Sequence, residues 1–248
     1  MKRIYNWKPS LPDARDFQYH LLVKPLPTVP VSIDPLTAFI AAYDQGQLGS
    51  CTGNGNARLF AHRYYIETKV LDMFSRLFIY LCERVEEGTV STDSGAQVRD
   101  GLKAMATYGV PLEKLWPYII SKFAVKPPTA VYAAAKKELA LRYMSVKVDL
   151  NAIKQSLAQG NPLVFGFTVF NSFESDAVAQ SGIMPMPAKG EKRLGGHCVV
   201  MDGYDDAKQI LWCENSWGTG WGQQGRFTMP YAFLNYCSDF WNLTKVAA

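Results

Sequence analysis

The spacing of apolar residues divides the chain into a helical first part and a strand-rich second part. Between residues 51 and 159, apolar positions recur at the three- and four-residue spacing of amphipathic helices. This pattern predicts a helix that begins at Cys51 and further helices over 75–86, 95–108, 130–143 and 149–159. Asp93 or Ser94 can cap the helix over 95–108, and Asp149 can cap the last helix.

Beyond Pro162 the apolar residues form short runs bounded by turn residues such as Asp205 and Asp206. These runs predict strands over 163–169, 197–204, 209–214, 225–229 and 240–245. Helices followed by strands are typical of an α+β fold, and we expect two lobes.

The first 30 residues carry five prolines, which prevent a long helix. We interpret this segment as a strap that runs extended over the surface and packs against the fold through Trp7, Phe17 and Tyr19. The alternative is a short prosegment or lid that lies in a substrate cleft and inhibits the protein.

The composition is that of an ordinary soluble globular protein, with 48% apolar and 19% charged residues in 248. Basic residues are scattered and the net charge is +4, so we expect no nucleic-acid partner. No apolar run approaches the ~18 residues of a membrane helix, so we expect no membrane partner. The N-terminus has no apolar region of a secretory signal, which leaves the compartment open between cytoplasm and export by another route.

The five cysteines are widely and irregularly spaced, which does not indicate a disulfide framework. We expect one reactive thiol and four buried ones. The three histidines and the five cysteines do not have the paired spacing of a structural zinc site, so we expect no metal site and no cofactor.

Four residues have the chemistry of a cysteine nucleophile with an oriented base. The start of a helix favours a thiolate at Cys51, His197 can take its proton, and Asn215 can orient the imidazole. Gln45 and the backbone N–H of Cys51 can bind a developing oxyanion, and Trp217 can shield the Asn–His hydrogen bond from water. Each residue alone also has a purely structural interpretation: a buried thiol, a core histidine or tryptophan, a turn asparagine, a loop glutamine.

Together these residues lie in motifs that resemble those of papain-like cysteine peptidases. The motifs are Gln45-Gly46 with Gly49-Ser50-Cys51, the apolar run after His197, the run over 214–222, and 108–110 with 116–118. His197 follows Cys51 by 146 residues, within the ~130–150 residues of that family. The similarity covers roughly residues 31–245.

The resemblance implies an α+β, papain-like two-lobe fold with the active-site cleft between the lobes. Residues 31–125 would form a mainly helical lobe that carries the nucleophile. Residues 126–248 would form an antiparallel β-barrel-like lobe that carries the histidine and the asparagine. Cys51 would be the nucleophile, His197 the base and then acid, Asn215 its orienter and Gln45 the oxyanion donor. Substrate would contact Ser94, Gly95, Ala96, Gly196, Trp217 and Ser238.

Three positions depart from the family pattern. Leu48 replaces a disulfide cysteine, Thr52 replaces the aromatic residue after the nucleophile, and Ala96 replaces a glycine of the substrate-binding strand. The first two resemble a bacterial-like branch that lacks the usual disulfides. The methyl group of Ala96 narrows the space for a substrate main chain. The long helical propeptide of other members is absent, so residues 1–30 are the candidate for self-inhibition.

We therefore expect a cysteine-type peptidase that acts on peptides or proteins through a thiolate and an acyl-enzyme intermediate. One alternative is a deamidase or transglutaminase-like enzyme that uses the same triad on side-chain amides. The other is a non-catalytic binding module of papain fold, which would not need the identities of all four residues.

Overall fold

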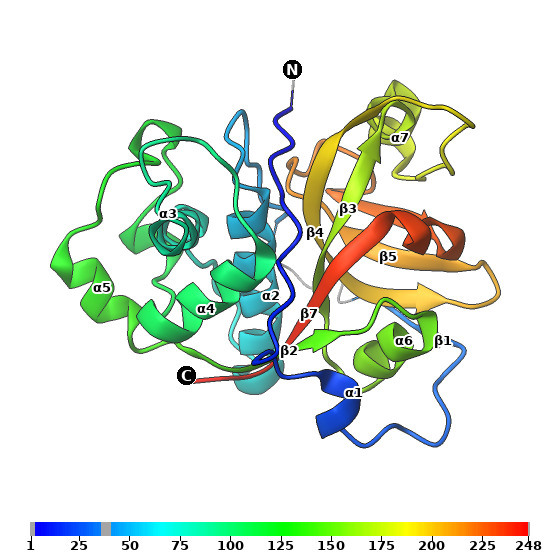
Figure 1. Cartoon of the computed structure of the whole chain (residues 1–248), viewed down its shortest axis with the longest axis horizontal. Helices are drawn as coiled ribbons and strands as arrows, with labels where there is room; N and C mark the ends of the chain where they lie inside the picture. Colours follow the sequence, from blue (N-terminus) through cyan, green and yellow to red (C-terminus); the bar gives the residue numbers. More distant parts are fainter. Residues whose placement is uncertain (1–2, 36–40, 248) are drawn as a thin grey trace.

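The computed structural model describes residues 3–35 and 41–247 of the chain. A lobe of helices lies beside a lobe built on an antiparallel sheet, and the N-terminal segment runs between them (Figure 1). The predicted α+β fold of two lobes is confirmed. None of the described helices is long and apolar enough to cross a membrane.

Four α-helices form most of the helical lobe, and the longest of them lies between the two lobes (Figure 1). They are α2 (Cys51–Thr68), α3 (Arg76–Glu86), α4 (Val98–Tyr108) and α5 (Thr129–Ala135), with the short turns η1 (Glu113–Leu115) and η2 (Ile120–Lys122). The first three turns of α2 are buried throughout, as in a core helix. Gly55 lets α2 approach the sheet, because a Cβ there would lie 2.9 Å from the Cys198 sulfur.

The sheet has the strand order β2-β7-β3-β4-β5-β6, with β1 paired to β4, and every pairing is antiparallel. The strands are β1 (Ser32–Ile33), β2 (Ala140–Val146), β3 (Leu163–Phe170), β4 (Arg193–Asp205), β5 (Ile210–Glu214), β6 (Arg226–Pro230) and β7 (Cys237–Val246). Short helices cover it: α1 (Tyr19–Leu22), α6 (Leu150–Ala158), α7 (Asp176–Ser181), η3 (Asn171–Glu174) and η4 (Tyr231–Tyr236). Among the described strands β2 and β6 do not pair, so the sheet is open and is not closed into a barrel.

Two predicted helices differ from the observed elements. The helix over 130–143 ends at Ala135, and β2 begins at Ala140 and pairs with β7, a non-local partner that outweighs the local Ala/Lys helix propensity. The helix expected from 95 begins at Val98, because residues before it are extended and Gly95 has a φ of 68°. Asp149 does cap α6, accepting from the Ala152 N–H.

Three clusters of buried side chains make up the core. One fills the sheet lobe, one joins α2 to the sheet and one lies inside the helical lobe. Phenylalanine rings dominate the first cluster: Phe165 stacks on Phe240 with centroids 4.7 Å apart, and Phe173 packs at 5.3 Å from Phe167. This rigid sheet core supports the strand that carries His197.

Candidate active site

Cys51 is the first residue of α2, as the sequence predicted, and lies where the two lobes meet. The backbone N–H groups of Cys51, Thr52 and Cys198 lower the pKa of its thiol, but burial outweighs them. Cys51 and Thr52 belong to the open first turn of a helix, whose free N–H groups stabilise negative charge. Cys198 follows His197 on β4 and lies in the same buried cluster as Cys51.

His197 lies on β4 and is fully buried, with its Nε2 2.8 Å from Asn215 Oδ1. The same asparagine oxygen accepts from the Ser216 backbone N–H at 2.8 Å. A backbone N–H only donates, so this atom must be the oxygen and His197 Nε2 must carry the hydrogen. Nδ1 has no hydrogen-bond partner among the described residues. It is therefore the unprotonated nitrogen, which can act as a base.

Aromatic rings surround the His197 imidazole. The Trp217 ring stacks on it with centroids 5.2 Å apart, and the Phe167 and Tyr5 rings meet it edge-on at 5.7 and 6.0 Å. Trp217 is itself buried. These rings exclude water from the His197–Asn215 hydrogen bond, which strengthens it.

Gln45 is buried and fixed next to Asn215. Its Oε1 accepts from Ser216 Oγ at 2.6 Å, and its backbone N–H donates to the Ser216 carbonyl at 2.9 Å. Its Nε2 donates to the Leu48 carbonyl at 3.0 Å. A carboxamide nitrogen carries two hydrogens, so one remains for a further acceptor.

Burial keeps both members of the Cys51–His197 pair uncharged in this structure. It raises the pKa of the Cys51 thiol to about 12 and lowers the pKa of His197 to about 4, while the Asn215 hydrogen bond opposes the second shift. The helix start was expected to favour a thiolate at Cys51. Desolvation outweighs that effect here, because neither residue has any exposed surface.

The N-terminal segment runs between the lobes (Figure 1), and its Tyr5 ring contacts the His197 imidazole. The Trp7 backbone N–H donates to the Gly196 carbonyl at 3.1 Å, and the Lys8 N–H donates to the Ala96 carbonyl at 3.2 Å. A Cβ at Gly196 would lie 2.5 Å from the Trp7 ring, and one at Gly166 only 1.9 Å from it. Glycine at these two positions therefore makes the slot in which the indole lies.

The residues predicted to bind substrate divide into two groups. Gly95, Ala96, Gly196 and Trp217 lie against the N-terminal segment, and Gly95 is closest, since a Cβ there would be 1.9 Å from the Asn6 carbonyl oxygen. The two serines are turned to other partners: Ser94 Oγ donates to Thr89 Oγ1 at 2.8 Å, and Ser238 pairs with Gly166 in the sheet. Contact of these residues with a substrate stays a prediction.

Sequence reasoning missed three residues of this region: Gly166, Asp239 and the Tyr118 hydroxyl. Gly166 did leave a signal, because a glycine inside an apolar strand often marks a close approach of another group. Asp239 accepts from the Ser10 backbone N–H at 3.0 Å and from its hydroxyl at 2.9 Å, and nothing local in the sequence indicates that contact.

A buried group of His62, Asp202 and Glu214 has its ligand atoms close enough to hold a metal ion. The arginines beside it favour a different interpretation. Glu214 accepts from Arg58 at 3.0 Å, from His62 at 2.6 Å and from Arg226 at 2.8 Å, and Arg226 also pairs with Asp202. Two guanidinium groups thus neutralise the two carboxylates, and the group is an ion-pair cluster that joins α2 to the sheet.

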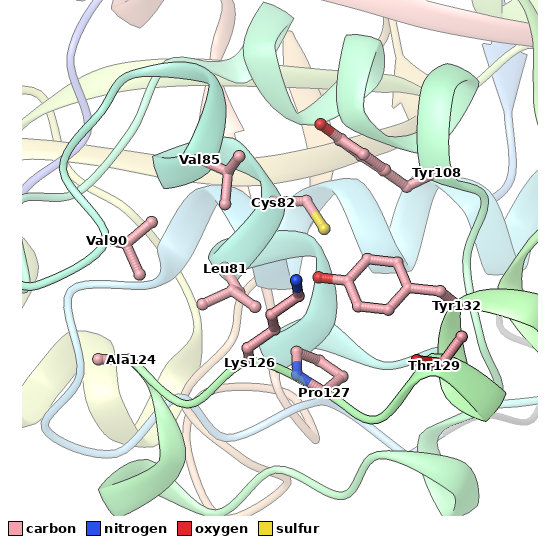
Figure 2. Close-up of a pocket in the computed structure, with 10 residues that line it drawn as sticks. All are labelled: Leu81, Cys82, Val85, Val90, Tyr108, Ala124, Lys126, Pro127, Thr129 and Tyr132. Atoms are coloured by element: carbon pink, nitrogen blue, oxygen red, sulfur yellow. The ribbon is translucent and has the colours of Figure 1, made fainter.

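A pocket of about 500 Å³ lies on the helical lobe, between α3, the end of α4 and α5 (Figure 2). Apolar side chains and two tyrosine rings form most of its wall, together with the Cys82 sulfur and the Lys126 ammonium group. None of the four predicted catalytic residues lines it. This pocket is therefore separate from the cleft that contains Cys51.

Comparison with known proteins identifies the family. A sequence model described as papain family cysteine protease matches residues 29–239. A peptidase C1-like protein of Acanthamoeba polyphaga mimivirus is 40% identical over 222 residues, covering 84% of this chain and 70% of that protein. The chain belongs to the papain family of cysteine proteases. It is a cysteine-type peptidase that acts on peptide or protein substrates, and neither the deamidase nor the binding-module alternative is favoured.

Solved structures agree with this placement. Xylellain, a cysteine protease from Xylella fastidiosa, superposes with a TM-score of 0.89 at 35% identity, covering 97% of this chain and 96% of that one. A digestive procathepsin L 3 of Tenebrio molitor has a TM-score of 0.71 at 18% identity and supports the fold alone. A cathepsin B-like protein of Giardia intestinalis is 28% identical over 198 residues, and the match spans 62% of its length.

Proposed function

We propose that Cys51, His197 and Asn215 are the catalytic triad of this peptidase and that Gln45 is an oxyanion donor. The observation that carries the assignment is the fixed tautomer of His197: its Nε2–H faces Asn215 Oδ1, which leaves Nδ1 as the base. Cys51 supplies the thiol at the start of α2, in the same buried cluster as Cys198 of β4.

The reaction follows from these positions. His197 Nδ1 takes the thiol proton, and the Cys51 sulfur attacks the substrate carbonyl carbon. The carbonyl oxygen becomes an oxyanion that accepts from Gln45 Nε2 and from the Cys51 backbone N–H. His197 then gives its proton to the leaving amine, which breaks the C–N bond and leaves a thioester. Water, deprotonated by His197, hydrolyses the thioester and restores the thiol.

The assignment is tested by the products of cleavage. A protein mixture treated with the enzyme should show new peptide termini in mass spectrometry, and Cys51→Ala should abolish them. Cys82→Ala is the matched control, because Cys82 is also buried but lies in the helical lobe, and it should retain cleavage. Modified glutamine or asparagine side chains without new termini would contradict the assignment.

We further propose that the N-terminal segment inhibits the enzyme by occupying its cleft. Support comes from the hydrogen bonds of Trp7 and Lys8 to the opposite walls of the cleft, and from the absence of exposed surface on Cys51 and His197. A substrate carbonyl cannot reach the Cys51 sulfur while the segment is in place, so activity requires that the segment leaves.

Side-chain contacts hold this segment at both ends. The Tyr5 hydroxyl donates to the Glu174 carboxylate, and the Arg3 guanidinium lies 5.0 Å from the centre of the Trp217 ring. Further along, Ser10 bonds to Asp239 through its backbone and its hydroxyl. The Trp7 indole contributes most, since burying an aromatic side chain is worth about 3–5 kcal/mol.

Substitution of Trp7 tests the inhibition without removing the rest of the strap. A truncation at Val31 would also delete Tyr19, a buried core residue. We expect Trp7→Ala to raise activity on a peptide substrate at least about tenfold, because each 1.4 kcal/mol of lost docking changes the open fraction tenfold. Phe17→Ala is the control, since Phe17 lies in the same strap but is 64% exposed. Equal activity of wild type and Trp7→Ala would contradict self-inhibition.

A further inference from the structure

The loop that carries both oxyanion donors is held from one side by a tyrosine hydroxyl. The Tyr118 hydroxyl donates to the Gln45 backbone carbonyl at 2.9 Å and lies 2.5 Å from Ser50 Oγ. The loop begins at Gln45 and ends at Ser50, directly before Cys51. The Tyr118 hydroxyl therefore connects the backbone of Gln45 to Ser50, the residue directly before Cys51.

The two outer groups of this network, Asn54 Nδ2 and the Gln45 carbonyl, fix the direction of its hydrogen bonds. Asn54 Nδ2 donates to Ser50 Oγ at 3.1 Å, and the Gln45 carbonyl can only accept. The Ser50 hydroxyl must then donate to Tyr118, and Tyr118 must donate to Gln45. The Ser50 and Tyr118 hydroxyls each donate their one hydrogen within this network, so the network is fully satisfied and rigid.

The Tyr118 ring is also held in place. The Arg76 guanidinium lies 4.0 Å from the ring centre, and Arg76 Nη1 donates to the Asp44 carbonyl at 3.0 Å, directly before Gln45. Burial raises the pKa of Tyr118 to about 12, so the phenol remains a neutral donor near pH 7.

We propose that Tyr118 is a positioning residue for the oxyanion hole: its hydroxyl sets the position of Gln45 relative to the backbone N–H of Cys51. The inference rests on the proposed roles of Gln45 and Cys51. Tyr118 acts through Gln45 and Ser50 and has no part in moving the thiol proton.

This role has a kinetic signature. Oxyanion donors bind the transition state more strongly than the substrate, so a misplaced donor lowers kcat and kcat/KM together and leaves KM nearly unchanged. Alkylation of Cys51 by iodoacetamide develops no oxyanion at the Gln45 position. Its rate should therefore not depend on the Tyr118 hydroxyl.

The test is Tyr118→Phe in the full chain, carried out in the wild type and in the Trp7→Ala background. We expect kcat to fall about 10- to 100-fold, with KM within about twofold and an unchanged rate of Cys51 alkylation. Tyr108→Phe is the matched control, because it removes a hydroxyl that donates to the Glu86 carboxylate at 3.2 Å within the helical lobe. The control should change neither parameter.

The outcomes separate this inference from the proposed function. A Trp7→Ala parent that cleaves nothing contradicts the proposed triad. An active Trp7→Ala parent whose kcat is matched within twofold by its Tyr118→Phe variant contradicts only the role of Tyr118. Equal losses of kcat and of the alkylation rate would also overturn it, since they indicate damage to the nucleophile. If Tyr118→Phe folds poorly, Ser50→Ala removes the other half of the bridge, and the same kcat loss without a change in KM is expected.

Discussion

At the scale of single residues, the arrangement around His197 determines what the site can do. The Ser216 N–H identifies the Asn215 oxygen, and that oxygen places the imidazole hydrogen on His197 Nε2. Nδ1 is then the nitrogen that receives the thiol proton in the proposed mechanism. Ser216 also orients Gln45 through its hydroxyl. Ser216 thus fixes both the proposed base and the proposed oxyanion donor.

We expect Asn215→Ala to lower kcat/KM roughly 10- to 100-fold, because the imidazole loses the acceptor that holds its tautomer and its orientation. Steady-state kinetics in the Trp7→Ala background measure this loss. Asn235→Ala is the control, since Asn235 lies on the surface and bonds only to the Ala232 carbonyl nearby. An Asn215→Ala enzyme with full activity would show that the hydrogen bond to His197 is not needed.

At the scale of elements, the sequence predicted the helix of Cys51 and the strand of His197 because each has a strong local pattern. The three-dimensional partners of these elements were not predictable. Residues 136–143 have helical composition, yet β2 forms there through pairing with β7, about a hundred residues away. The contact between Tyr118 and Gln45 likewise joins positions 73 residues apart, and no local spacing indicates it.

The contact between α2 and the sheet depends on the buried ion-pair cluster around Glu214. We expect Glu214→Gln to destabilise the protein by about 3–5 kcal/mol, because buried guanidinium groups lose their counter-charge. Denaturation by urea measures the change. Lys208→Gln, which removes an exposed partner of Asp205, should cost less than about 1 kcal/mol. Equal costs for both variants would contradict the structural role of the cluster.

At the scale of the whole molecule, the N-terminal segment runs between the lobes and, in the proposed function, covers the active site. The strap was predicted from its prolines, and its alternative as a lid in the cleft was left open by the sequence. The position of Trp7 in a glycine-walled slot supports the lid, while α1 shows that a later part of the same segment packs as a strap. The two interpretations describe different stretches of one segment.

Acid should favour release of the segment. The pKa of His197 is lowered by burial from 6.5 to about 4, so the closed form holds a neutral imidazole. A lowered histidine pKa means that the closed form is fully favoured above pH 6.5 and loses about 2–3 kcal/mol as the pH falls towards 4. Arg3, Asn215 and the ring of Tyr5 face His197 in the closed form.

The NMR signal of the Trp7 indole should therefore shift towards its open-state position between pH 6.5 and 4.5, before global unfolding. In His197→Gln the shift should be reduced, since no imidazole remains to gain a proton. A closed population that stays constant over this range in the wild type would contradict the linkage.

The central claim is that Cys51 is the nucleophile and that the N-terminal segment covers it. Its most direct test is the order in which iodoacetamide labels the five cysteines, read by peptide mass spectrometry. All five are buried in the closed form, so wild type should label slowly at every position, whereas Trp7→Ala should label Cys51 first and much faster than the other four. Labelling of Cys82 or Cys213 before Cys51 in Trp7→Ala, or rapid labelling of Cys51 in the wild type, would contradict the claim.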